Sequence, residues 1–451
     1  MLIEVISLLV LAWVSAATVD RYHSHKIRLS RLGTSPGPFG LLTWWGRWKW
    51  LKHGHGLVIQ NYAKSKSTNS NYVIQTLTGD LVVLAPKYLD ELNMLPESKL
   101  SSTKRLVDSV MGEHTGVDLL LQDHLSSDIC RGPLRKNLRK HLHPGSPGLV
   151  GAATKAKIDS HEHCENKIWK DALAALPFHV EITKRNQIFR DPVTVRRVLF
   201  PSSTEPVSRE EPSVTKLLID SGKDRDPDRI TARLLILSGA ALHTSSMAMT
   251  HAIYNLCAMP HYVEQLRSEA KKALSEDGGE WKFTTLQKLH RLDSFLKESQ
   301  RLNHTTFLGF DRQVISPIEL SDGKTVLPPG TTVAVPGGPM SLDPAFYDLP
   351  TEFDDLRFYN LAQNDDHEKS TNNKYTYTGI EPGNLSWGSG RFTCPGRWYA
   401  DAMIKLILAN LLLKYDVSFF PNGVTDRPPN RKYNTEVHPD FEQKIVLRKR
   451  A

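Results

Sequence analysis

The sequence predicts a mainly helical protein with a minor β-sheet, built as a single large domain behind an N-terminal membrane helix. Three observations lead to this prediction. A long apolar run at residues 230–257 and several amphipathic runs after it have helical spacing, whereas β-like pieces are short and few. No internal repeat or long linker divides the 451-residue chain after Pro38. A composition of 40% hydrophobic and 24% charged residues is that of a globular protein with a sizeable core.

The chain begins with a stretch long enough to cross a bilayer. Residues 2–19 are apolar apart from Glu4 and small hydroxyl residues, and a spanning helix needs about 20 residues. Basic residues follow at once and favour a cytosolic body: Arg21, Lys26, Arg28 and Arg31. Residues 20–38 then predict a basic hinge rich in Pro and Gly at its end, and residues 39–451 the globular domain. A cleavable secretory signal competes with the anchor, because residues 14–16 are small, but no positive region precedes the apolar stretch.

The strongest helix signal lies in the middle of the chain. Asp226 can cap its start, Pro227 fits its first turn, and Pro260 closes the apolar run 230–257. A helix of roughly 28 residues is about 40 Å long, and one that is apolar on most sides must run through a core. Further helices are predicted at residues 262–274, 285–302 and 397–415. Strand-like pieces are predicted at 71–84 and 331–336, a turn at 321–323, and breaks at 143–151, 201–213 and 363–373.

Charge and cysteine usage exclude several classes of protein. A net charge of +8 and a pI of 9.1 suit nucleic acid, an anionic membrane or an acidic protein. The basic residues are scattered rather than striped along one element, which argues against nucleic acid. Four widely spaced cysteines without a CxxC pair argue against zinc ribbons, iron–sulfur clusters and a dense disulfide framework. Residues 161–164 contain two His and a Cys but lack the HExxH spacing of a metal helix.

One loop carries a cysteine in a setting suited to chemistry. Residues 387–397 combine glycines, which tolerate positive φ, with Cys394 directly ahead of an amphipathic helix. A sulfur near a helix N-terminus is stabilised as thiolate by unpaired N–H groups and by the positive end of the helix dipole. The other interpretation is a turn with a buried free cysteine.

This loop resembles that of the cytochrome P450 superfamily, which reads aromatic-Gly-x-Gly-x-(Arg/His)-x-Cys-x-Gly before a long helix. The resemblance implies the cytochrome P450 fold and a haem b cofactor, with Cys394 as the axial iron ligand whose thiolate favours O–O cleavage. Phe392 stands where the family has a His or Arg for a haem propionate, and Arg391 is the candidate to compensate. The loop residues expected at the haem are Trp387, Gly388, Gly390, Arg391 and Gly396.

Two further motifs resemble the same superfamily. Glu298 and Arg301 match its ExxR signature, in which the two side chains share one helical face. Residues 353–358 resemble its next element and assign Arg357 to the same buried cluster, although Asp355 replaces the usual proline. Such a cluster is expensive to bury unless fully hydrogen-bonded, so its expected role is to fix the geometry behind the haem. Arg312 is expected to reach a haem propionate, with a solvent-facing arginine as the alternative.

The predicted central helix contains the stretch that resembles the family's oxygen-activating segment. Its residues 239–244 are mostly small, so the backbone can approach a haem face, and the Thr244 hydroxyl is the candidate to support proton delivery. The alternative is that this hydroxyl bonds back to the carbonyl of Ala240. His243 stands where most members have an acid, so the catalytic residues are predicted to be Thr244 and His243. This variant resembles fungal members related to ent-kaurene oxidase.

The resemblance implies a monooxygenase of lipophilic small molecules, expected to be terpenoids or other fungal secondary metabolites. Electrons would come from NADPH through NADPH-cytochrome P450 reductase, docked near Cys394 with help from Arg397 and Lys405. The anchor implies the endoplasmic reticulum membrane, with the catalytic domain cytosolic and no nucleic-acid partner. The alternative is a haem-binding protein without monooxygenase activity: an isomerase, a dehydratase or a degenerate copy. It rests on His243 and on residues 126–213, which match the family poorly, look short and have no WxxxR signature near them.

Overall fold

The structure is a computed structural model that describes residues 29–33, 43–77, 79–110, 117–122, 128–131, 217–219, 221, 226–364, 374–421 and 423–450. Several predicted segments lie outside the described residues: the anchor 2–19, most of the hinge 20–38, most of 126–213, and the breaks 143–151 and 201–213. So does the His/Cys run at 161–164. Among the helices that are described, none is long and apolar enough to cross a membrane.

Among the described residues, the main sheet has six strands in the order β1-β2-β3-β8-β5-β4. Their bounds are β1 Ser30–Leu32, β2 Tyr72–Thr76, β3 Gly79–Val83, β4 Leu100–Ser101, β5 Gly309–Val314 and β8 Thr332–Val335. The predicted strand piece 71–84 is a hairpin, because β2 and β3 pair antiparallel with Thr76 opposite Gly79. Part of the predicted hinge is strand β1, which pairs parallel with β2 at the edge of the sheet. Those three residues therefore belong to the folded domain.

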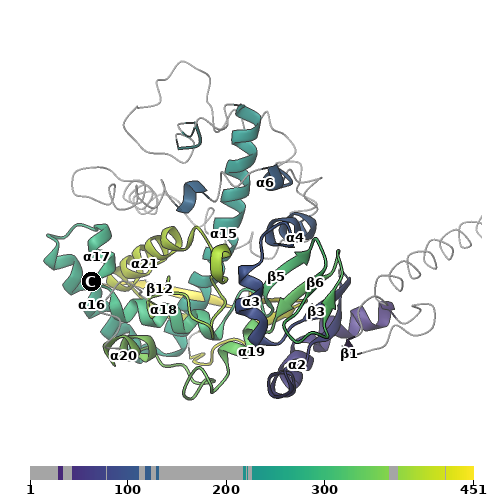
Figure 1. The fold of residues 1–451 in the computed structure, drawn as a ribbon. Helices are drawn as coiled ribbons and strands as arrows, with labels where there is room; N and C mark the ends of the chain where they lie inside the picture. Colours follow the sequence, from purple (N-terminus) through teal and green to yellow (C-terminus); the bar gives the residue numbers. More distant parts are fainter. Residues whose placement is uncertain are drawn as a thin grey trace, which may run out of the picture.

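The longest described helix is α15 (Pro227–Ala258), which begins and ends where the sequence predicts. It contacts α18 (His290–Leu302) and α21 (Arg397–Lys414), and α16 (Val263–Glu276) packs against both of these helices. Their apolar side chains form one buried core that includes Leu256, Phe295 and Leu408. Figure 1 shows α16, α18 and α21 on one side of the molecule and the sheet on the other, with α15 rising between them. The predicted balance of mainly helix with a minor sheet is confirmed.

One predicted helix is divided in two. The run 285–302 forms α17 (Phe283–Gln287) and α18, with a break at Lys288 and Leu289. The carboxylate of Glu269 on α16 accepts the backbone N–H groups of Arg291 (2.7 Å) and Leu292 (3.0 Å), which are unpaired donors of the first turn of α18. A contact from another helix thus fixes where α18 begins, and the local sequence does not show it.

The remaining elements complete the two halves. The helices are α2 (Thr43–Thr68), α3 (Leu89–Met94), α4 (Ser102–Ser109), α6 (Leu119–Gln122), α19 (Gly337–Ser341) and α20 (Arg357–Asn364). The short hairpin of β6 (Ile318–Glu319) and β7 (Val326–Leu327) encloses the predicted turn at 321–323. After α21, strand β9 (Tyr415–Phe420) pairs with β12 (Lys444–Lys449), and β10 (Arg431–Tyr433) pairs with β11 (Glu436–His438).

Candidate active site

The cysteine loop takes its shape from two glycines. Gly388 has φ +77° and Gly390 has φ +59°, a region that L side chains rarely adopt. Space is tight as well, since a Cβ on Gly390 would lie 2.6 Å from Oδ1 of Asn93 on α3. The Cys394 N–H donates to the carbonyl of Trp387 at 2.7 Å and closes the loop. Any side chain at these two glycines would therefore force the loop to move.

Cys394 lies immediately before the N-terminus of α21. The backbone N–H groups of Gly396 and Arg397 and the Arg397 guanidinium favour the thiolate, but burial outweighs them and raises the pKa of the free thiol. A metal ion that binds the sulfur deprotonates it outright. Gly396 differs from the other two glycines: its φ is −88° and it caps α21 in the right-handed region. Gly396 contributes its backbone N–H, which lies beside the Cys394 sulfur and favours the thiolate.

A hydrogen-bonded chain holds the back of the loop. The Trp387 indole Nε1 donates to the carbonyl of Tyr377 (2.6 Å), and the Tyr377 N–H donates to Oδ1 of Asp293 on α18 (3.1 Å). The Lys405 ammonium on α21 pairs with the same Asp293 oxygen at 2.6 Å and with Asp401 at 2.9 Å. Lys405 is only 5% exposed. The expectation that Lys405 contacts a reductase is therefore wrong, since its charge is used inside the protein.

The exposed cations at the loop are different ones. The Arg391 guanidinium donates to the carbonyl of Met94 at the end of α3 (2.9 Å), on the exposed side of the loop. Arg131, which no sequence pattern singled out, donates from Nη2 to the carbonyl of Arg391 (2.9 Å) and is also exposed. The predicted helper Arg397 instead donates to the carbonyl of Cys394 at 2.9 Å. Arg131 was missed because its pairing spans 260 residues of sequence.

Arg312 is buried beneath the same loop. Its guanidinium lies 4.4 Å from the ring centroid of Phe310 and 5.0 Å from that of Phe392, at cation–π distance from both. Nη1 donates to the carbonyl of Asp311, while Nε is buried and has no hydrogen-bond partner. Burial lowers the pKa of Arg312 to about 10, so the side chain stays cationic at neutral pH. The alternative of a solvent-facing arginine does not hold for this side chain.

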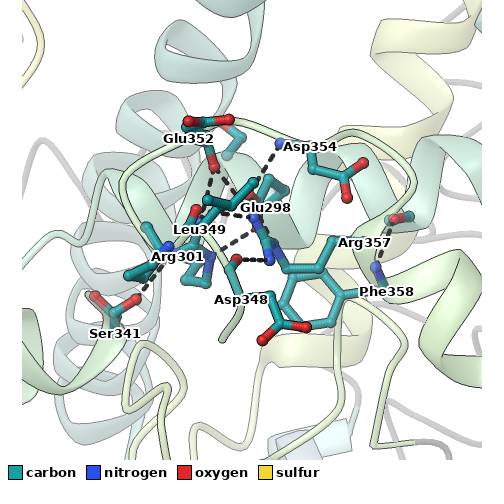
Figure 2. Close-up of polar contacts among 12 residues, drawn as sticks. Glu298, Arg301, Ser341, Asp348, Leu349, Glu352, Asp354, Arg357 and Phe358 are labelled. Atoms are coloured by element: carbon teal, nitrogen blue, oxygen red, sulfur yellow. Dashed lines mark hydrogen bonds and ion pairs between the residues drawn. The ribbon is translucent and has the colours of Figure 1, made fainter. Parts of the chain in front are cut away.

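The ExxR residues meet in the core, as Figure 2 shows. Glu298 receives two bonds from Arg301, Nε to Oε2 and Nη2 to Oε1, both at 2.7 Å. Arg357 from α20 adds a third, Nε to Oε1 at 3.1 Å. Glu298 and Arg301 are fully buried and Arg357 nearly so. The structure therefore contains the predicted cluster, in which Glu298 pairs with both Arg301 and Arg357.

The same cluster also ties down the chain that leads to the cysteine loop. Arg301 Nη1 donates to the carbonyls of Ser341 (2.7 Å) and Pro350 (2.6 Å), and the Asp354 N–H donates to Glu298 (3.1 Å). One carboxylate and two guanidiniums thus organise backbone from α18 to α20 (Figure 2). Because all these donors have acceptors, the burial of charge is compensated.

The predicted catalytic residues lie on an exposed stretch of α15. Thr244 is exposed, and its hydroxyl donates to the carbonyl of Ala240 at 2.9 Å, the intrahelical bond named above as the alternative. The ring centroid of His243 is 6.0 Å from that of His438 on β11. Nε2 of His438 is 2.9 Å from a carboxylate oxygen of Glu436, and its Nδ1 is buried without a partner. A second imidazole, absent from the sequence prediction, therefore stands behind His243.

These features fit a haem with one thiolate ligand. Cys394 offers a sulfur with N–H groups beside it, and Arg312 offers a buried guanidinium with an unpartnered Nε for a carboxylate such as a propionate. The exposed stretch of α15 includes Leu242, which is 61% exposed, and so presents an apolar surface. The Arg391 guanidinium already donates to a backbone carbonyl at the end of α3, so Arg312 is the better candidate to bind a haem propionate.

Comparisons with known proteins agree with one another. The family model described as Cytochrome P450 matches residues 183–439. Cytochrome P450 monooxygenase olcJ of Penicillium canescens is 30% identical, covering 82% of this chain and 80% of its own. Ent-kaurene oxidase of Fusarium fujikuroi is 30% identical, covering 91% and 86%. A crystal structure of a cytochrome P450 (CYP102L1) superposes with a TM-score of 0.54 at 14% identity, over 87% of this chain and 94% of that one.

Proposed function

Because this chain belongs to the cytochrome P450 monooxygenase family, we propose that it hydroxylates a lipophilic small molecule, a terpenoid or another fungal secondary metabolite. The overall change is R–H + O2 + NADPH + H+ → R–OH + H2O + NADP+. The observation that carries the proposal is Cys394, held at the start of α21 with the N–H groups of Gly396 and Arg397 on its sulfur. When bound, haem b supplies the oxygen chemistry, and the thiolate favours O–O cleavage.

The chain's own residues divide the remaining tasks. Arg312, with its guanidinium close to two aromatic rings, would neutralise a haem propionate, and the buried Glu298 cluster keeps the backbone behind the site fixed. The exposed apolar stretch of α15 receives the substrate. On the same stretch, the Thr244 hydroxyl orients water, and the imidazole of His243, backed by His438 and Glu436, holds a proton where most of the family has an acid.

The proposed electron donor is NADPH-cytochrome P450 reductase. Two cations are exposed at the cysteine loop, Arg131 and Arg391, and they replace Arg397 and Lys405 as the proposed contacts with an acidic partner. For localisation we keep the endoplasmic reticulum membrane, with residues 2–19 as a single-pass anchor and the domain in the cytosol, because the apolar stretch and its basic flank support that arrangement. Lipophilic substrates partition into the same membrane.

Turnover with a terpenoid tests the proposed function. Purified haem-loaded protein, the reductase, NADPH and ent-kaurene or a related hydrocarbon are incubated under 18O2. We expect NADPH use that depends on the hydrocarbon and a product with one labelled oxygen. A panel of terpenoids that stimulates no NADPH use, with haem and reductase both present, would contradict the proposal.

A second candidate function is a haem-dependent isomerase or dehydratase. It is favoured by His243 in place of an acid and by the Thr244 hydroxyl, which is bonded to its own helix. The same incubation separates the two functions. A rearranged or dehydrated product that forms without NADPH or O2 supports this second function, whereas an 18O-labelled product excludes it.

Haem retention tests the role of Arg312. In Arg312→Gln the propionate loses a charged donor in a buried site, an interaction worth about 1.5–3 kcal/mol. We expect haem to transfer to apomyoglobin at least about tenfold faster, the rate change that corresponds to roughly 1.4 kcal/mol. Arg391→Gln is the matched control, since its guanidinium binds backbone carbonyls on the exposed side, and its transfer rate should stay unchanged. If only the Arg391 variant lost haem faster, the propionate contact would have to be assigned to Arg391 and not to Arg312.

A further inference from the structure

The helix α2 has an unusual composition for a surface helix. Its 26 residues contain four of the chain's nine tryptophans and five Lys or Arg residues, and no Asp or Glu. Figure 1 shows α2 beside the outer edge of the main sheet, near β1 and away from the helical half. Nothing in the proposed reaction uses these residues, so their arrangement calls for a separate explanation.

Two tryptophans and two lysines share one exposed face of α2. Trp45 is 40% and Trp48 is 38% exposed, and their rings stack with centroids 5.0 Å apart. The Lys49 ammonium lies 5.7 Å from the Trp45 ring and the Lys52 ammonium 4.2 Å from the Trp48 ring. The spacing 45, 48, 49, 52 places all four on one side of the helix. Ile59, 43% exposed, extends this side by two turns.

The opposite face of α2 is fixed to the domain. The Trp50 indole Nε1 donates to Oδ1 of Asn434 at 2.8 Å, and Nε2 of His55 lies 3.0 Å from the Asn434 carbonyl. Burial lowers the pKa of His55 to about 4, so this imidazole is neutral. Val58 is fully buried on the same side. Because these contacts fix the rotation of α2, the helix cannot turn to hide the Trp45–Trp48 face.

We propose that the Trp45–Trp48 face, together with Lys49 and Lys52, docks onto the anionic headgroup region of a lipid bilayer. Tryptophan concentrates at the membrane–water interface because one end of its ring system is apolar and the other is polar. Lysines extend their apolar stems along such a surface and place the ammonium among anionic headgroups. The absence of carboxylates on α2 removes repulsion from those headgroups.

Nucleic acid fits this face less well than lipid does. Bases bind single-stranded-nucleic-acid proteins by stacking on open aromatic faces, whereas Trp45 and Trp48 stack on each other and carry lysines over their rings. The predicted anchor, residues 2–19, precedes α2 by 23 residues of sequence and would deliver the domain to the same membrane. The proposal deepens the membrane localisation proposed above, but the face would bind anionic lipid with or without that anchor.

Fluorescence quenching by brominated lipid tests the docking. Full-length haem-loaded protein is reconstituted in bilayers of phosphatidylcholine and phosphatidylserine with bromines near the headgroup. A Trp13→Phe background removes the one tryptophan of the predicted anchor. We expect quenching to persist in this background and at least half of it to disappear when Trp45→Phe and Trp48→Phe are added. Trp281→Phe, a partly buried tryptophan of the helical core, is the control and should leave quenching unchanged.

Charge reversal gives the second measurement. In Lys49→Glu/Lys52→Glu we expect quenching in the mixed bilayers to fall to the level seen in phosphatidylcholine alone, whereas the exposed pair Lys271→Glu/Lys272→Glu on α16 should have no effect. Equal quenching with and without Trp45 and Trp48 overturns the proposal. A lysine pair that alters reductase affinity but not lipid contact also overturns it and makes the face a protein-docking surface. Vesicle flotation and turnover, measured in parallel, report on the anchor and the monooxygenase separately.

Discussion

Replacing Cys394 with alanine is expected to remove the red-shifted Soret band of the reduced carbon monoxide complex entirely. That band reports a thiolate on the iron, and Cys394 is the cysteine that the structure places at the start of α21, with N–H groups of Gly396 and Arg397 on its sulfur. Monooxygenase turnover should fall to the background rate of free haem, because the thiolate is what favours O–O cleavage. The measurement is a difference spectrum of equal amounts of folded protein.

Two further variants make this result interpretable. Cys394→Ser keeps the volume and a polar atom, so it should fold as the wild type does and still lack the thiolate band. Cys257→Ala removes a buried thiol that belongs to a separate hydrophobic cluster with Tyr254 and Phe419, and should keep the band. An unchanged band in Cys394→Ser or its loss in Cys257→Ala would take the ligand assignment away from Cys394.

Glu298→Ala is expected to destabilise the protein by about 3–5 kcal/mol. Removing one partner of a buried ion pair leaves uncompensated charge, and here two guanidiniums, those of Arg301 and Arg357, would be left without their carboxylate in the core. The melting temperature should drop by roughly 3–5 °C, because the unfolding entropy of a 451-residue chain is about 1 kcal/mol per kelvin. Haem content after purification should drop with it, because the same cluster fixes the backbone between α18 and α20.

The control is an ion pair within one helix on the surface of the protein. Lys104 and Asp108 on α4 pair at 2.6 Å with both side chains partly exposed. Exposed pairs contribute about 0.2–1 kcal/mol, so Asp108→Asn should change the unfolding free energy by no more than that. Urea unfolding of both variants decides the matter. If the Glu298 variant were as stable as the Asp108 variant, the buried cluster would contribute little to the free energy of unfolding, contrary to the prediction.

Much of the fold and of the site can be predicted from the sequence, because the interactions that determine these parts join residues close together in the chain. The helix α15 begins at Pro227, a residue suited to the first turn, and ends two residues before Pro260, as the sequence predicts. The cysteine loop needs glycine at positions 388 and 390, whose φ values are positive. The ExxR pair is three residues apart, so helix geometry alone brings Glu298 and Arg301 together. In each case the determining contacts span only a few residues.

What only the tertiary structure decided are contacts between residues far apart in the chain. Lys405 is predicted to be a surface cation, yet its ammonium pairs with Asp293 in the core. Glu269 divides the predicted helix 285–302 by capping α18 from another helix. Arg131 reaches the cysteine loop, and Asn434 holds α2 so that Trp45 and Trp48 face outward. Sequence patterns record the periodicity of one element at a time, whereas burial and long-range hydrogen bonding depend on which elements pack together. That packing is settled only when the whole chain folds.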